Sequence, residues 1–198
     1  MDEVAFRRGL DRGAVPPIVL AHGADAQALD DAVAALDRCL FGEPSAAAFD
    51  RHVFDAREAS VEAVLNAALT VPVLAPRRLV VVRHAQAWPS RAAASLEAYA
   101  AAPSPTTCLV LLAGEALGPN RERPSPHWLL AAVPGSAQVE VGLRRGRAVE
   151  EWLRRRAEAE GIAVTEEAAR LLVQMVGEDG ARLLGEVRKG ALAGGPDP

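Results

Sequence analysis

The chain has 198 residues, of which 50% are hydrophobic, and its 22 basic and 26 acidic side chains leave a formal net charge of -4. This composition excludes disordered and collagen-like chains and fits one full domain with a smaller unit. The weak negative charge excludes an overall attraction to nucleic acid or anionic lipid. No apolar run approaches the ~20 residues of a membrane helix, and residues 1–13 lack the apolar core of a secretory signal, so we expect a cytoplasmic protein.

Short apolar runs and helical patterns alternate through most of the chain. The runs predict strands at 18–21, 52–54, 78–82, 108–112 and 138–141. Apolar residues spaced by threes and fours predict helices at 25–40, 61–69, 91–100 and 128–132, with Gly42 and Pro44 ending the first and Ser60 capping the second. Continuously apolar strands that are separated by helices pair in parallel and are buried on both faces. Residues 16–142 are therefore predicted to form a doubly wound α/β domain with a parallel sheet.

After Val141 the alternation gives way to consecutive helices. The pattern predicts a helix over 147–160, a second to Val176 that Thr165 caps, and a third over 180–189. We therefore divide the chain into an α/β domain at 1–142 and a small three-helix lid domain at 143–198. Residues 114–126, which are rich in proline, glycine and arginine, form the longest predicted loop.

The turn after the first strand is a candidate phosphate site, because a parallel sheet with a helical lid is common among nucleotide-binding switches. A P-loop needs glycines whose N–H groups cradle the phosphates and a lysine that reaches the outer ones. The turn at 22–28 has one glycine, no lysine, and Asp25 where an anion would be repelled. Asp25 is instead predicted to be a helix N-cap. Neither ATP hydrolysis nor a cofactor is expected. No metal is expected either, because Cys39 and Cys108 match no zinc or disulfide spacing.

The pair Arg83-His84, at the end of the third predicted strand, resembles the signature of histidine phosphatases. In that chemistry a histidine takes up the phosphoryl group, arginines neutralise the phosphate, and a second histidine and an acid transfer protons. His127 is the histidine that remains downstream. In that family the signature ends the first strand, whereas here it follows a later one. A surface Arg-His pair is the competing interpretation, and a phosphatase stays the enzymatic alternative.

A cluster of arginines lies at 144–156. Its members are Arg144, Arg145, Arg147, Arg154, Arg155 and Arg156. Such a cluster is able to contact a phosphate backbone. Glutamates are interleaved with these arginines, which favours a solvated helix face over a nucleic-acid site.

The connection between the second helix and the third strand is apolar and yet contains two prolines, Pro72 and Pro76. Proline interrupts both helix and sheet, so Val71, Val73 and Leu74 are predicted to lie on a connection and not within an element. Apolar side chains on a rigid loop form a wedge that fits a partner's pocket. The alternative is that they fold back and cover the edge of the sheet.

These segments together resemble the delta subunit of the bacterial DNA polymerase III clamp loader. In the α/β part the resemblance is carried by PIVL at 17–20, HGAD at 22–25, VFDAREAS at 53–60 and PRRLVVVR at 76–83. In the lid it is carried by EWLRRRA at 151–157, Gly161, TEEAARLL at 165–172, Val176-Gly177 and LGEVRK at 184–189. The similarity extends over nearly the whole chain, and the order and spacing of the motifs are more specific than any one of them.

The resemblance implies an AAA+-like fold that has lost its own ATPase site. In that family delta binds the sliding clamp, the beta subunit, through an apolar wedge at the end of the helix before the third strand, and helps to open the ring. By position this wedge falls on Val71, Val73 and Leu74. Other clamp-loader subunits, whose ATP controls the wedge, are implied partners, DNA is reached through the assembled complex, and no membrane is involved. The family also has a third helical domain that builds the collar, and this sequence ends before it.

We therefore expect a delta-like subunit of the clamp loader that acts in DNA replication within the DNA polymerase III holoenzyme and has no catalytic activity of its own. Two alternatives stay open. One is a histidine-phosphatase-like hydrolase that uses Arg83 and His84, and the other is a generic AAA+-type interaction module.

Overall fold

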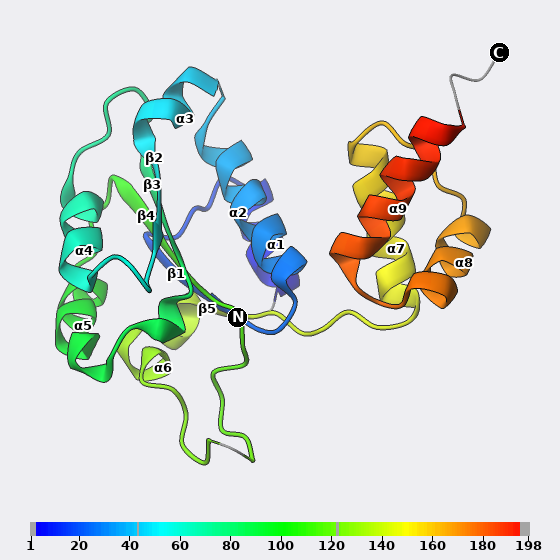
Figure 1. Cartoon of the computed structure of the whole chain (residues 1–198). Coiled ribbons are helices and arrows are strands. Elements are labelled where there is room, and N and C mark those ends of the chain that lie inside the picture. Colours follow the sequence, from blue (N-terminus) through cyan, green and yellow to red (C-terminus); the bar gives the residue numbers. More distant parts are fainter. Residues whose placement is uncertain (1–2, 43, 122, 195–198) are drawn as a thin grey trace. The chain divides into compact units, whose positions relative to one another are not determined.

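The computed structural model describes residues 3–42, 44–121 and 123–194. The chain divides into two compact units, Met1–Gly142 and Leu143–Pro198, which are described separately below (Figure 1). Among the described residues, none of the helices is both long enough and apolar enough to cross a membrane. No group of three or more His, Cys, Asp or Glu side chains in this part of the chain is placed to hold a metal ion.

The first unit is built on a parallel sheet with the strand order β2-β3-β4-β1-β5. Its strands are β1 (Ile18–His22), β2 (Arg51–Asp55), β3 (Arg78–Arg83), β4 (Thr107–Ala113) and β5 (Gln138–Glu140). β4 is buried along its whole length and pairs with both β1 and β3, because its continuously apolar sequence suits the centre of a covered sheet. The predicted doubly wound α/β architecture is confirmed.

Helices cover both faces of this sheet, as Figure 1 shows. One face is covered by α4 (Val61–Leu69), α5 (Ala93–Ala101) and α6 (Leu129–Ala132), and the other by α1 (Glu3–Asp11) and α2 (Ala26–Leu40). The helix α3 (Pro44–Asp50) leads into β2, and short 3-10 turns lie at Ala85–Ala87, Ser90–Ala92 and Gly135–Ala137. Each face has its own apolar core, so the strands separate two hydrophobic layers.

Two predicted N-caps fix where the covering helices begin. The Asp25 carboxylate accepts a hydrogen bond from the Ala28 amide at 2.9 Å, and the Ser60 hydroxyl accepts one from the Ala63 amide at 3.2 Å. Each cap satisfies an N–H group that the first helical turn leaves without a partner. Both predictions are confirmed, and α4 has the predicted bounds.

The sequence reasoning missed the helices α1 and α3. In α1, Phe6 and Leu10 lie four residues apart and are both buried, which is an amphipathic signal hidden among charges. The sequence pattern predicts that Pro44 ends the preceding helix, whereas it is the first residue of α3. Proline is favoured there because the first helical N–H has no intrahelical partner. The fifth strand ends at Glu140, one residue before its predicted end.

The second unit consists of α7 (Arg147–Ala159), α8 (Glu166–Val176) and α9 (Gly180–Ala193). Thr165 caps α8, as predicted, through a hydrogen bond from the Ala168 amide. The apolar core of the second unit is formed by Val149, Trp152, Leu153, Ala157, Ala169, Leu183, Leu184 and Val187. Several arginines of the predicted cluster make ion pairs within the unit, Arg147 with Glu151 and Arg156 with Glu160. These pairs agree with a solvated helix face.

Candidate partner-binding site

The connection from α4 to β3, residues 70–77, carries exposed apolar side chains, and we call it the wedge loop. The side chains of Val71, Val73 and Leu74 are 69%, 68% and 57% exposed. Ala75, in the same loop, is buried, so the loop turns its backbone inward and its larger side chains outward. The alternative interpretation, in which these residues fold back over the edge of the sheet, is therefore wrong.

A buried carboxylate lies beneath the wedge loop. Asp50, the last residue of α3, is completely buried, and its two oxygens accept hydrogen bonds from three successive amides of the loop. The distances are 2.6 Å from the Val73 nitrogen, 2.7 Å from Leu74 and 2.8 Å from Ala75. Without this carboxylate the three inward-facing amides would lose their charged acceptor.

Arg78, the first residue of β3, completes this anchor. It is 5% exposed, and its Nη2 atom lies 3.4 Å from Asp50 Oδ1 and donates a hydrogen bond of 2.9 Å to the Val71 carbonyl oxygen. Its Nη1 atom contacts Nε2 of His52. The guanidinium therefore binds the loop from below at a residue that the Asp50 carboxylate does not reach, and its planar fork of donors suits several acceptors at once.

The charge of Asp50 is maintained by its hydrogen bonds. Burial raises the pKa of a carboxyl group, but the amides of Ala75, Leu74 and Val73 and the nearby Arg78 guanidinium outweigh burial, and the pKa of Asp50 lies below its ordinary value. The group is thus ionised at neutral pH and accepts hydrogen bonds through both oxygens.

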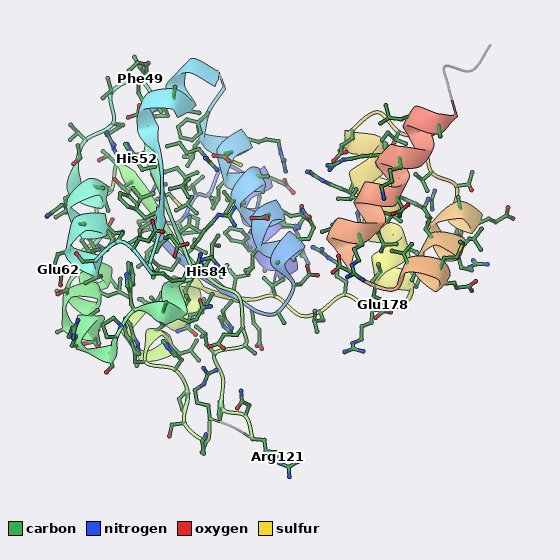
Figure 2. All side chains as sticks on the ribbon, viewed as in Figure 1. Phe49, His52, Glu62, His84, Arg121 and Glu178 are labelled. Carbon is green, nitrogen blue, oxygen red and sulfur yellow. The ribbon has the colours of Figure 1, made fainter. Side chains whose placement is uncertain are left out.

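Further exposed apolar residues, which the sequence reasoning did not single out, lie in elements next to the wedge loop. They are Phe49 in α3, Val53 in β2 and Leu69 at the end of α4, with exposures of 57%, 45% and 61%. Phe49 directly precedes Asp50, which contacts the wedge loop, and Figure 2 shows it at that end of the sheet. The sequence offers only a weak signal for their exposure, an apolar residue beside a polar one at the end of a helix. Buried core residues often show the same pattern, so it does not identify exposed ones.

The turn at 22–28, the candidate phosphate site, lies at the opposite, carboxyl end of the sheet. Gly23 has a φ of +151°, and a Cβ atom there would lie 1.9 Å from the Val141 carbonyl oxygen. The Gly23 amide donates to the Ala113 carbonyl, and the Val141 amide donates to the His22 carbonyl. The chain after β5 therefore packs directly against this turn, which needs glycine for close backbone approach.

Arg83 and His84 also lie at the carboxyl end, where Figure 2 shows His84 far from Phe49. His84 has a left-handed backbone with a φ of 55°, and its Nδ1 atom lies 3.1 Å from Asp55 Oδ2. Asp55 also binds the Arg57 guanidinium, and the Arg83 guanidinium lies 2.7 Å from Asp30. The hydrogen bonds and the charge of Arg57 hold the pKa of Asp55 far below its usual range. Each arginine beside His84 is thus neutralised, which leaves little positive charge for a phosphoryl group.

No contact among the described residues joins His84 to the second candidate histidine. The Nδ1 atom of His127 accepts a hydrogen bond from the Leu129 amide at 3.3 Å, and its ring lies beside Trp128. Burial lowers the pKa of His127. The arrangement that a histidine phosphatase needs is therefore not favoured by this geometry.

Comparison with solved structures identifies the fold. The Bacillus subtilis DNA clamp loader delta protein superposes with a TM-score of 0.66 at 22% identity, covering 97% of this chain and 57% of that chain. The Thermotoga maritima RuvB Holliday junction branch migration motor gives 0.59 at 12% identity, covering 93% and 57%. A Thermotoga maritima DNA polymerase III gamma subunit-related protein gives 0.51 at 15% identity, covering 77% and 49%. The chain thus spans about half the length of these proteins and has an AAA+-like fold.

Comparison of the sequence with protein families agrees with the structural comparison. A search of curated proteins found no match. The family model described as DNA polymerase III, delta subunit, matches residues 23–129, which is more than half of the chain and includes the wedge loop and both residues of its anchor. The chain therefore belongs to the DNA polymerase III delta subunit family.

Proposed function

We propose that this chain acts as a delta subunit of the clamp loader and binds the sliding clamp, the beta subunit, through the wedge loop during DNA replication. The observation that carries the proposal is the outward direction of Val71, Val73 and Leu74 on a backbone that Asp50 and Arg78 hold from beneath. Exposed apolar side chains on a fixed backbone are typical of the anchors that fill a partner's pocket. Family membership supports this assignment.

The wedge loop opens the clamp by binding the open or strained form of the ring more tightly than the closed form. A ligand shifts a conformational equilibrium only by its difference in affinity for the two states. Three aliphatic side chains provide apolar area and no charge, so the binding free energy comes from removing that area from water. The clamp pocket that receives them is therefore apolar.

ATP hydrolysis in this proposal belongs to other clamp-loader subunits. The turn at 22–25 has no lysine, its Asp25 is used to cap α2, and its glycine packs against the chain after β5. These features support a subunit without its own ATPase site or cofactor. The ATP-binding subunits control when the wedge loop reaches the clamp, and DNA is contacted by the assembled complex.

Binding of the purified chain to the sliding clamp of its own organism tests the proposal. The variant carries Val73→Ser and Leu74→Ser together. The matched control carries Leu171→Ser and Met175→Ser, which remove exposed apolar groups of similar size from α8, where the exposures are 56% and 75%. We expect saturable binding by the wild type and the control, and a loss of at least about tenfold in affinity for the wedge variant.

The two alternatives give different results in the same experiment. Equal binding by the wedge variant and the wild type contradicts the site, and no binding by a folded wild type to an intact clamp contradicts the function and favours a generic interaction module. Phosphatase turnover that His84→Ala abolishes would support the hydrolase instead.

A further inference from the structure

The anchor beneath the wedge loop joins residues that are distant in the sequence. Asp50 accepts hydrogen bonds from the amides of Val73, Leu74 and Ala75, which lie 23, 24 and 25 residues later in the sequence. Arg78 follows the loop and returns to the carbonyl oxygen of Val71, seven residues earlier. One buried carboxylate and one buried guanidinium therefore bind the backbone of four loop residues, Val71, Val73, Leu74 and Ala75.

This arrangement determines which way the backbone and the side chains of the wedge loop face. Three successive N–H groups that converge on one carboxylate form a concave backbone surface, and that surface faces inward. The side chains of Val73 and Leu74 are consequently left on the outside. Pro72 and Pro76 add fixed φ angles within the same segment. These hydrogen bonds and prolines thus constrain the backbone of the loop in the free chain.

A buried ion pair is poor evidence for stability by itself, because well-packed apolar residues stabilise a fold as well or better. It is better suited to fixing one geometry among several. Fixing a loop in its bound geometry before association reduces the ordering entropy that binding would otherwise lose. The directions of the hydrogen bonds agree with that role, since each one constrains the loop backbone.

We propose that Asp50 and Arg78 are positioning residues that hold the wedge loop in its binding conformation and thereby raise its affinity for an apolar pocket on the clamp. This inference rests on the proposed function and deepens it, because it concerns residues that do not touch the partner. It separates two roles within one site: the side chains of Val73 and Leu74 make the contact, and the buried pair determines where they point.

The test compares Asp50→Asn with Asp30→Asn in the full chain. Both substitutions replace one carboxylate of an Asp–Arg pair by an amide of similar size, but Asp30 pairs with Arg83 at the other end of the sheet, where both side chains are nearly half exposed. Hydrogen exchange measures how fast the amide protons of Val73, Leu74 and Ala75 exchange with solvent, and a titration measures the affinity for the clamp. We expect Asp50→Asn to accelerate exchange at these amides and to weaken clamp binding about tenfold, and Asp30→Asn to change neither.

Local and global effects are separated by the exchange data. A merely structural role accelerates exchange throughout the strands, whereas a positioning role accelerates it in the wedge loop and leaves β3 and β4 protected. If Asp50→Asn does not fold, Arg78→Lys replaces it, because lysine keeps the charge and loses the planar set of donors. The wild type also gives a direct answer, since unprotected amides at 73–75 would overturn the proposal.

Failure of this inference is distinguishable from failure of the proposed function. If the wild type binds the clamp and Asp50→Asn binds equally well despite fast exchange in the loop, the positioning role is overturned and the proposed function stands. If the wild type does not bind, the proposed function is overturned and the positioning role with it.

Discussion

The two ends of the parallel sheet use their charged groups in opposite ways. At the carboxyl end, Asp55 binds both Arg57 and His84, on surfaces open to solvent. At the amino end, Asp50 and Arg78 are buried and bind the backbone of a loop whose side chains face outward. The first arrangement neutralises its own charges, and the second one holds a loop whose apolar side chains face solvent.

This difference is informative because ligands of open α/β sheets usually bind at the carboxyl ends of the strands. In this chain the turn after β1 is packed against Val141, and the neighbouring arginines are paired with carboxylates. Exposed apolar residues are found instead in the wedge loop before β3, at Leu69 directly before that loop, and at Phe49 directly before Asp50. The comparison predicts larger effects on binding from changes at the amino end.

The largest effect is expected from Asp50→Ala. It leaves the Arg78 guanidinium buried without its carboxylate and removes the acceptor of three amides. Breaking a buried pair on one side lowers the free energy of unfolding by about 3 kcal/mol. Chemical denaturation measures it, with Asp55→Ala at the exposed end as the control, which should unfold almost like the wild type. Similar losses for both variants would remove the distinction between the two ends.

Gly23→Ala is expected to destabilise the chain by about 2 kcal/mol. The added Cβ atom would lie 1.9 Å from a backbone oxygen that cannot rotate away, and the φ of +151° disfavours any side chain. Thermal or chemical unfolding measures the loss, and Gly118→Ala, where a Cβ atom would meet nothing within 4 Å, is the control. A stable Gly23→Ala variant would show that the turn is open, as a phosphate site requires.

Phe49→Ser is expected to weaken clamp binding by about 1 kcal/mol, or roughly fivefold, and to leave stability nearly unchanged. The ring is more than half exposed and directly precedes the residue that anchors the wedge loop, and we expect it to extend the apolar surface of that loop. Titration with the clamp measures the change, and Leu192→Ser, in α9, is an exposed apolar control. Unchanged affinity would restrict the contact to the wedge loop.

The smallest effect is expected when the free energy of unfolding is measured as a function of pH. The loop amides favour ionised Asp50, so its pKa is lower in the folded chain than the ordinary value of 3.8. The resulting stabilisation is complete above the unfolded-state pKa and is lost as the pH falls through the lower folded-state value. The difference in unfolding free energy between wild type and Asp50→Asn should therefore be constant near neutral pH and shrink in acid. A difference that grows in acid would contradict the anchor.

The sheet was predictable because its strands are short, continuous apolar runs, and the caps at Asp25, Ser60 and Thr165 because capping depends on residues three positions apart. The two prolines predicted a connection before the third strand, but the exposure of its apolar side chains came from the structure. Asp50 was not predictable, because its partners lie more than 20 residues away and nothing in its neighbourhood marks it as buried. Local patterns determine elements, whereas the anchor depends on the tertiary fold.

The measurement that tests this account most directly is hydroxyl-radical footprinting of the chain with and without the sliding clamp. It reports side-chain exposure at both ends of the sheet in one experiment. The account predicts that Leu74 and Phe49 react in the free chain and become protected by the clamp, while His84 reacts equally in both states. Protection of His84 without protection of Leu74 would contradict it and place the binding surface at the carboxyl end.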